Sequence, residues 1–199
     1  MDRRKFLRLT AGTGMSGFAA LQGLSCATMS HLVAQEGDGG YGPLERAGPD
    51  FKLPAGFQYK KLGITGSIMS DGNPTPAQHD GMGAFPMPNG NIRLIRNHEV
   101  AGRPVDSPIA LPVYDWLTGG GTVSLEIDST TREVVRDFVS LSGTAVNCAG
   151  CTTPWGSWLT CEEIIVGLPR VERSHGYVFE IPVSAEEPVE PVPLKAMGR

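Results

Sequence analysis

Short apolar stretches separated by turn residues run through the chain after about residue 50 and predict a series of β-strands. Val, Ile, Phe, Tyr and Trp are concentrated in these stretches, and no long segment has the period of an α-helix. We expect strands at residues 56–62, 92–99, 121–127, 134–141, 158–161 and 176–181. The strands at 121–127 and 134–141 flank a short polar turn at 128–130, so they should pair as a hairpin.

Many short strands predict an all-β fold such as a sandwich, a barrel or a propeller. Glycine (26 residues) and proline (16) make up about a fifth of the 199 residues, well above the usual share of about 12%, which argues against a helical bundle. A propeller blade needs ~40–50 residues, so residues 51–199 would supply about three blades, fewer than the roughly four that close a ring. If the fold is a β-propeller, it is therefore incomplete, and an export leader precedes it.

The first 27 residues have the features of that leader. Arg3 and Arg4 belong to a basic start, residues 11–24 are small and apolar, and a cleavage site follows Ala27. The arginine pair followed by Phe-Leu resembles the twin-arginine export signal of bacteria. The expectation is export by the twin-arginine machinery to the periplasm or the medium. Residues 28–50 are predicted to be a linker or irregular arm, followed by one domain over 51–199.

Composition and charge exclude several functional classes. With 40% hydrophobic and 19% charged residues, the chain is not a disordered one. The net charge of −4 disfavours a nucleic-acid partner, and the leader is basic, so the remainder is more negative still. No uninterrupted apolar run reaches ~18 residues, so we expect no transmembrane helix.

The first segment with candidate chemistry begins at His79-Asp80-Gly81 and continues into the strand 92–99, which ends Arg-Asn-His-Glu. Alternation along a strand places Asn97 and Glu99 on one face and His98 on the other. An amide and a carboxylate at a strand end could hold a hard cation such as calcium. The competing interpretation is a solvated strand end, with Asp80-Gly81 serving as a turn.

The second segment runs from Asn147 to Glu163 and contains Cys148, Cys151 and Cys161. Three interpretations remain open on spacing. The cysteines could be buried or oxidised structural residues, Cys148 and Cys151 could form a redox pair, or one thiolate could bind a transition metal beside carboxylates. No second pair of cysteine or histidine ligands has the spacing of a structural zinc site.

Five segments of the chain resemble the PhoX-type alkaline phosphatase family and follow that family's order. They are HDGMGAFP, LIRNHE, GGTVSLEID, NCAGCTTPWGSWLTCEE and HGYVFEIP, within residues 50–199. The long cysteine-containing segment is the most specific of them. The resemblance implies a β-propeller with a calcium- and iron-containing centre that hydrolyses phosphate monoesters outside the cytoplasm.

The resemblance also implies roles for particular residues. Cys148 matches the family's iron-binding cysteine, Glu99 matches a metal-binding glutamate, and Glu163, with Glu162 as a second choice, matches the carboxylate after Leu-Thr-Cys. His98, Asn97 and Asp80 are candidates for contacts to the ligands or to phosphate. Members of the family continue well beyond residue 199, so we expect part of the site to be missing and the 199-residue chain alone to be inactive.

Two other functional classes stay open beside the phosphatase. A propeller without a complete metal centre would be a non-catalytic module that binds calcium or another ligand. A chain that uses Cys148 and Cys151 as a dithiol would be a redox protein. Metal content separates the three classes, because iron with calcium favours the phosphatase, calcium alone the binding module, and a titratable dithiol without metal the redox protein.

Overall fold

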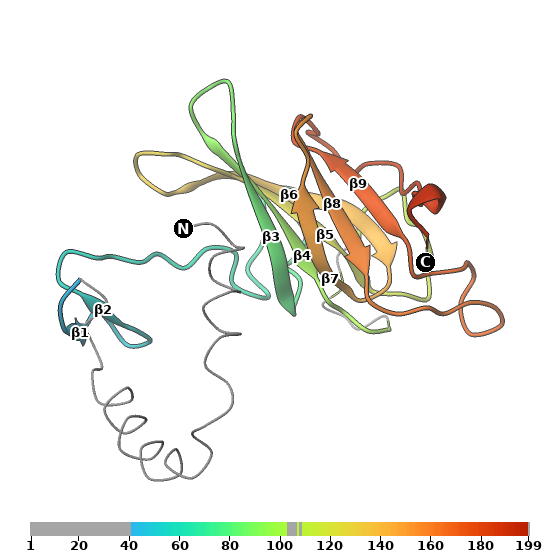
Figure 1. Ribbon diagram of the computed structural model, residues 1–199, viewed down its shortest axis with the longest axis horizontal. Helices are drawn as coiled ribbons and strands as arrows, with labels where there is room; N and C mark the ends of the chain where they lie inside the picture. Colours follow the sequence, from blue (N-terminus) through green and yellow to red (C-terminus); the bar gives the residue numbers. More distant parts are fainter. Residues whose placement is uncertain (1–40, 103–106, 108, 199) are drawn as a thin grey trace, which may run out of the picture. The chain divides into compact units, whose positions relative to one another are not determined.

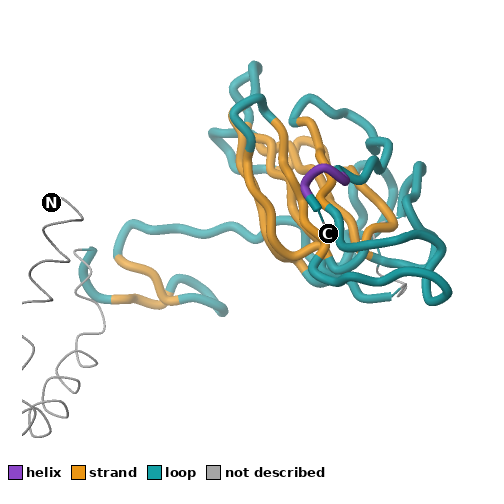
Figure 2. Tube along the Cα trace, turned by 45° about the vertical axis from the view of Figure 1, so that its right-hand side comes forward, coloured by secondary structure: helices purple, strands orange, loops and turns teal. Residues whose placement is uncertain are grey.

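The computed structural model describes residues 41–102, 107 and 109–198, and the chain divides into two compact units, Met1–Tyr59 and Lys60–Arg199. The expected leader at residues 1–27 and most of the expected linker lie outside the described residues. All sheets among the described residues are antiparallel (Figure 1). The helical structure in the same residues is a single 3₁₀ turn, η1 (Lys195–Met197) (Figure 2). The all-β prediction is confirmed, whereas the propeller stays a prediction.

The smaller unit contains one hairpin in its described part. Strands β1 (Leu44–Arg46) and β2 (Lys52–Pro54) pair antiparallel. Two edge-to-face ring contacts, Tyr41 on Phe57 and Phe51 on Tyr59, support it. Strand β1 therefore lies inside the stretch that was expected to be an irregular arm.

The larger unit consists of two antiparallel sheets whose strands follow sequence order. The four-stranded sheet contains β3 (His79–Pro86), β4 (Ile92–His98), β5 (Gly120–Ile127) and β6 (Val134–Thr144). The three-stranded sheet contains β7 (Asn147–Thr152), β8 (Ser157–Glu162) and β9 (Val178–Pro182). In each sheet, strands that are consecutive in the sequence pair with one another. Short turns join β3 to β4, β5 to β6 and β7 to β8, whereas long loops join β4 to β5 and β8 to β9.

Five of the six predicted strands are confirmed as β4, β5, β6, β8 and β9, and the predicted hairpin is the β5–β6 pair. The strand predicted at 56–62 is wrong. Its start is a turn closed by the Phe57 amide on the Pro54 carbonyl, with Gly56 at a φ of 84°. Strands β3 and β7 were missed, because glycine and small polar residues hide their strand character.

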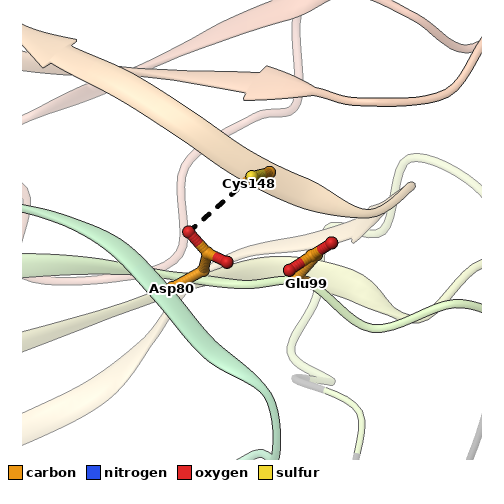
Figure 3. A group of neighbouring side chains, drawn as sticks. All are labelled: Asp80, Glu99 and Cys148. Carbon is orange, nitrogen blue, oxygen red and sulfur yellow. Dashed lines mark hydrogen bonds between the residues drawn. The ribbon is translucent and has the colours of Figure 1, made fainter. Parts of the chain in front are cut away.

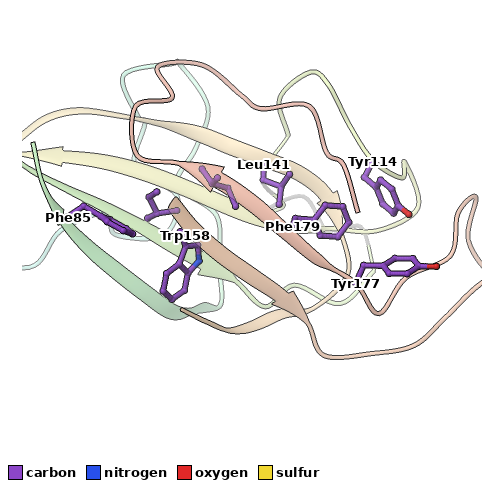
Figure 4. Packing of buried hydrophobic residues seen from close by; sticks show 8 residues of the cluster. Phe85, Tyr114, Leu141, Trp158, Tyr177 and Phe179 are labelled. Carbon is purple, nitrogen blue, oxygen red and sulfur yellow. The ribbon is translucent and has the colours of Figure 1, made fainter. Parts of the chain in front are cut away.

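Two hydrophobic clusters stabilise the larger unit. The first joins the two sheets and is drawn in Figure 4; its members are Phe85, Ile95, Tyr114, Leu141, Trp158, Tyr177, Phe179 and Ile181. The second gathers side chains of β5 and β6 around Met69. Within the described residues, no helix is long and apolar enough to cross a membrane.

Trp158 fixes how closely strands β3 and β7 approach. Its indole lies where side chains on two glycines would stand, because a Cβ on Gly83 of β3 would be 2.6 Å from the ring and a Cβ on Gly150 of β7 would be closer still. The side chain is buried, with 4% exposed. The two missing side chains let one indole pack against both edge strands, which brings the sheets together at one end.

Candidate metal centre

Four candidate ligands lie at equivalent places in the hairpins β3–β4 and β7–β8. Asp80 is the second residue of β3, and Glu99 directly follows β4. Cys148 is the second residue of β7, and Glu163 directly follows β8. Because the two strands of each hairpin are antiparallel, the start of the first strand and the end of the second lie at the same end of the hairpin.

Asp80, Glu99 and Cys148 converge on one point. Among the described residues they form a group in which one ligand atom from each side chain lies within 4.8 Å of the others (Figure 3). The Cys148 thiol donates a hydrogen bond to the Asp80 carboxylate, with 3.7 Å between Sγ and Oδ1. Residues 68 positions apart in the sequence thus contribute to one cluster.

The carboxylates of this cluster repel one another. Hydrogen bonds with the Asp80 and Glu163 carboxyls, together with burial and their charges, raise the pKa of Glu99 to about 7. Glu163 is therefore a neighbour of the three-residue group because its carboxyl shares a hydrogen bond with Glu99. A shared proton is how such a carboxylate cluster relieves its repulsion without a cation, and a cation in its place would relieve it further.

The thiol of Cys148 belongs to the same electrostatic environment. Partial burial and the charges of Asp80, Glu163 and Glu99 raise the pKa of the Cys148 thiol. A metal ion reverses this preference, because binding releases the thiol proton. The cluster therefore offers both hard oxygen donors and a soft sulfur donor to a metal ion.

Asn97 joins the two hairpins beneath the cluster. Its side-chain amide donates to the carbonyls of Cys148 (2.7 Å) and Ala149 (3.0 Å). Its carbonyl oxygen accepts from Trp158 Nε1 (2.9 Å) and Thr160 Oγ1 (2.8 Å). The side chain is fully buried, so Asn97 fixes the backbone that carries Cys148 and does not face the ligand cluster.

Glu162 has other partners than the cluster. Its carboxylate accepts from the amides of Ala145 (2.8 Å), Gly176 (2.6 Å) and Tyr177 (2.9 Å), and it contacts His175 Nδ1 at 2.6 Å. With only 8% of the residue exposed, these contacts occupy both oxygens. The structure thus places Glu163 at the cluster and gives Glu162 a buried bracing role.

His175 connects Glu162 to Asp115. The ring's second nitrogen lies 3.2 Å from the Asp115 carboxylate. Burial disfavours the imidazolium, but hydrogen bonds and charges from Glu162 and Asp115 outweigh it and raise the pKa of His175. Sequence reasoning did not assign this pair, although His175 opens the HGYVFEIP segment.

His98 is buried as well and points away from the ligands. Its Nδ1 lies 2.7 Å from the Ala77 carbonyl, and Arg96 Nε donates to its Nε2 at 3.4 Å. Burial lowers the pKa of His98 to about 3, so the ring is neutral near pH 7. Contact of His98 with phosphate is therefore not what its surroundings favour.

The described cysteines are free thiols that separate into two places. Cys148 lies beside Asp80, whereas Cys151 is close enough to Cys161 for its charge, after burial, to raise the pKa of the Cys161 thiol. Cys151 and Leu159 are paired across β7 and β8, which puts Cys151 and Cys161 on one face of the sheet. This arrangement favours Cys148 as a ligand over a dithiol with Cys151.

A family model described as Alkaline phosphatase PhoX matches residues 39–135 and 116–199. The chain belongs to the PhoX alkaline phosphatase family. The match spans both hairpins and all four candidate ligands, so the PhoX resemblance of the five sequence segments is confirmed. Comparison with curated proteins gives no match, and neither does comparison with solved structures.

Proposed function

We propose that this PhoX family chain carries part of the metal centre of an exported phosphomonoesterase, with Asp80, Glu99, Cys148 and Glu163 as ligands. The convergence of Asp80, Glu99 and Cys148 from two hairpins, with Glu163 hydrogen-bonded to Glu99, carries the proposal. Family membership supplies the reaction class. Calcium and iron are the metals that this mixed donor set suits.

The residues of the cluster would prepare the site for a charged substrate. Bound cations would supply electrostatic stabilisation of the phosphate oxygens and of the leaving oxygen. Glu99 and Cys148 would lose their protons on loading, so the cluster should take up metal more tightly as the pH rises. Asn97, buried and fully hydrogen-bonded, would hold the Cys148 backbone while the thiol exchanges its proton.

A blade-like role for the two sheets fits the same proposal. A four-stranded antiparallel meander is the unit from which propeller blades are built, and β3–β6 has that form. In a propeller, successive blades present equivalent strand ends to the central axis, where ligands from several blades can meet. The equivalent placement of the Asp80–Glu99 and Cys148–Glu163 pairs favours this arrangement over a simple sandwich.

The reaction is tested by Cys148→Ser in a chain extended to the length of the PhoX family members. A serine hydroxyl stays protonated near neutral pH and is a poor iron ligand. We expect iron content of the purified protein and hydrolysis of p-nitrophenyl phosphate to fall together, by about a hundredfold in activity. Cys151→Ser, on the same strand but outside the cluster, should leave both near the wild-type level.

Two outcomes would contradict this assignment. Full iron content in the Cys148→Ser protein would remove Cys148 from the ligands. Calcium without iron in the unmodified protein would favour a non-catalytic binding module instead.

Export by the twin-arginine route belongs to the same proposal and rests on the Arg3-Arg4 pair and the apolar stretch after it. Replacement of both residues by lysine keeps the charge but removes the pair that the pathway recognises. We expect the precursor to accumulate in the cytoplasm, measured by fractionation and immunoblotting. Normal delivery of the double variant to the periplasm would rule this route out.

A further inference from the structure

The hairpins β3–β4 and β7–β8 begin with the same uncommon backbone conformation. Gln78 directly precedes β3 and has a φ of 52°, and Val146 directly precedes β7 and has a φ of 53°. The carbonyl of each accepts a hydrogen bond from the amide of the candidate ligand that follows the second strand. The Glu99 amide donates to Gln78 and the Glu163 amide to Val146, each at 2.9 Å.

The same β-bulge follows in both hairpins. In the first, His79 pairs with His98 and Met82 with Arg96, so two residues of β3 face one residue of β4. In the second, the pairs are Asn147 with Glu162 and Gly150 with Thr160. The first bulged residue is Asp80 in one hairpin and Cys148 in the other. A bulge redirects a side chain out of the regular alternation, and here it redirects a candidate ligand each time.

The far ends of the two hairpins also agree. In the first turn, the Met87 amide donates to the Asn91 carbonyl and the Gly90 amide to the Met87 carbonyl. In the second turn, the Thr153 amide donates to the Ser157 carbonyl and the Gly156 amide to the Thr153 carbonyl. Gly90 and Gly156 have φ values of 86° and 84°. The second hairpin is shorter by two residues on each side. Two residues is the strand period, so the shortening leaves every side chain on its face.

A buried side chain braces the residue before each left-handed position. The residue that precedes Glu99 is His98, whose ring contacts the Ala77 carbonyl at 2.7 Å. The residue that precedes Glu163 is Glu162, whose carboxylate accepts from the Ala145 amide at 2.8 Å. Different chemistry thus ties the same two positions of each hairpin together.

We propose that this bulged hairpin is a ligand-presenting unit used twice, in which the backbones of Gln78 and Val146 are positioning elements for the two pairs of metal ligands. The inference rests on the proposed metal centre, and it adds two residues that act through their backbones. Each left-handed residue turns its carbonyl toward the amide of the carboxylate ligand. The bulge that follows then places Asp80 or Cys148 beside that carboxylate.

The cost of the conformation supports a positioning role. Residues with a side chain seldom adopt positive φ, and a β-branched residue such as Val146 does so only where the surroundings demand it. Val146 is buried, with 8% exposed, whereas Gln78 is exposed. Two unlike residues in unlike surroundings share the conformation, so the ligand geometry, and not local packing, is the common cause.

Backbone substitutions at Gln78 test the inference on the full 199-residue chain, with Tb³⁺ luminescence as the probe for the carboxylates. Glycine adopts positive φ freely and alanine removes only the side chain, so Gln78→Gly and Gln78→Ala should bind Tb³⁺ within about twofold of the wild type. Proline holds φ near −65° and cannot take the observed conformation. Gln78→Pro should raise the dissociation constant for Tb³⁺ at least about tenfold.

The Val146 variants test the second hairpin with Cd²⁺ in a chain whose other cysteines (Cys26, Cys151 and Cys161) are replaced by serine, so that the thiolate absorption band reports the bond to Cys148. Val146→Gly should keep the band and the affinity, and Val146→Pro should lose affinity at least about tenfold. Should Val146→Pro fail to fold by circular dichroism, the Gln78 comparison decides, because that residue is exposed.

The outcomes separate the two proposals. A folded Gln78→Pro chain that binds Tb³⁺ as tightly as Gln78→Gly would overturn the positioning role while leaving the metal centre intact. A wild-type chain that binds neither Tb³⁺ nor Cd²⁺ would overturn the metal centre, and the positioning role with it.

Discussion

Gly81 shows how closely single residues control the candidate centre. A Cβ at this position would lie 2.5 Å from the Cys148 carbonyl oxygen and 3.3 Å from Asn97 Nδ2. Both neighbours are part of the hydrogen bond that joins the hairpins. Glycine is therefore required between Asp80 and the rest of β3 because of the close approach of another backbone.

Gly81→Ala should destabilise the chain by about 1–3 kcal/mol, since the added methyl group meets backbone that cannot move without breaking the Asn97 contact. Urea unfolding measures the change. Gly167→Ala is the matched control, because a Cβ there would meet only Ser174 Oγ at 3.7 Å. A Gly81→Ala chain as stable as the control variant would show that the hairpins are not in the contact described.

Strand prediction succeeded and failed for reasons that the individual strands make plain. Strands β5 and β6 are rich in β-branched residues and leucine, with a polar turn between them, and sequence alone identified both. Strand β3 contains Gly81 and Gly83, whose role is to admit a carbonyl and an indole from elsewhere in the chain. Such contacts are tertiary, so local propensity does not reveal them.

The residues of the candidate site likewise divide into those that the sequence identified and those that only the fold reveals. Cys148, Glu99 and Glu163 were selected by family resemblance. The structure groups Cys148 and Glu99 with Asp80, and Glu163 is a hydrogen-bond partner of Glu99. Glu162 was selected by the same resemblance, yet its partners depend on His175, which follows 13 residues later. Adjacent glutamates at a strand end face opposite sides, and only the fold shows which of them meets the cluster.

The buried contacts of His175 with Glu162, at the end of β8, and with Asp115 should make the stability of the chain depend on pH. The folded-state pKa of His175 is raised above its ordinary value of 6.5, chiefly by Glu162 once burial is outweighed. The stabilisation that protonated His175 gives to the folded state is therefore complete below pH 6.5 and is lost as the pH rises through the raised pKa. The Asp115 and Glu162 carboxylates and the edge of the Tyr114 ring are its neighbours.

We expect the difference in unfolding free energy between the wild type and His175→Gln to be largest at or below pH 6.5 and to narrow as the pH rises. Denaturant titrations of both chains, without metal, measure it over the neutral and alkaline range. The comparison cancels the titration of Glu99, which both chains share. A difference that is constant with pH would show that His175 is not held as an imidazolium.

The larger unit as a whole combines a repeated hairpin with an asymmetric pair of ligands. Both hairpins supply a carboxylate after the second strand, but the bulge supplies Asp80 in one and Cys148 in the other. Oxygen and sulfur donors differ in the metals they select. A duplicated backbone could thus give a mixed centre through the change of one ligand type, which is consistent with membership of the PhoX family.

Cadmium titration of Asp80→Asn asks most directly whether the two hairpins bind one ion together. With Cys26, Cys151 and Cys161 replaced by serine in every chain compared, the thiolate absorption band follows the Cys148 bond, while the tested substitution lies on the other hairpin. If both residues contact the same ion, the dissociation constant should rise at least about tenfold. Glu187→Gln, an exposed carboxylate outside the cluster, should match the wild type. An Asp80→Asn chain with wild-type affinity would contradict a shared centre.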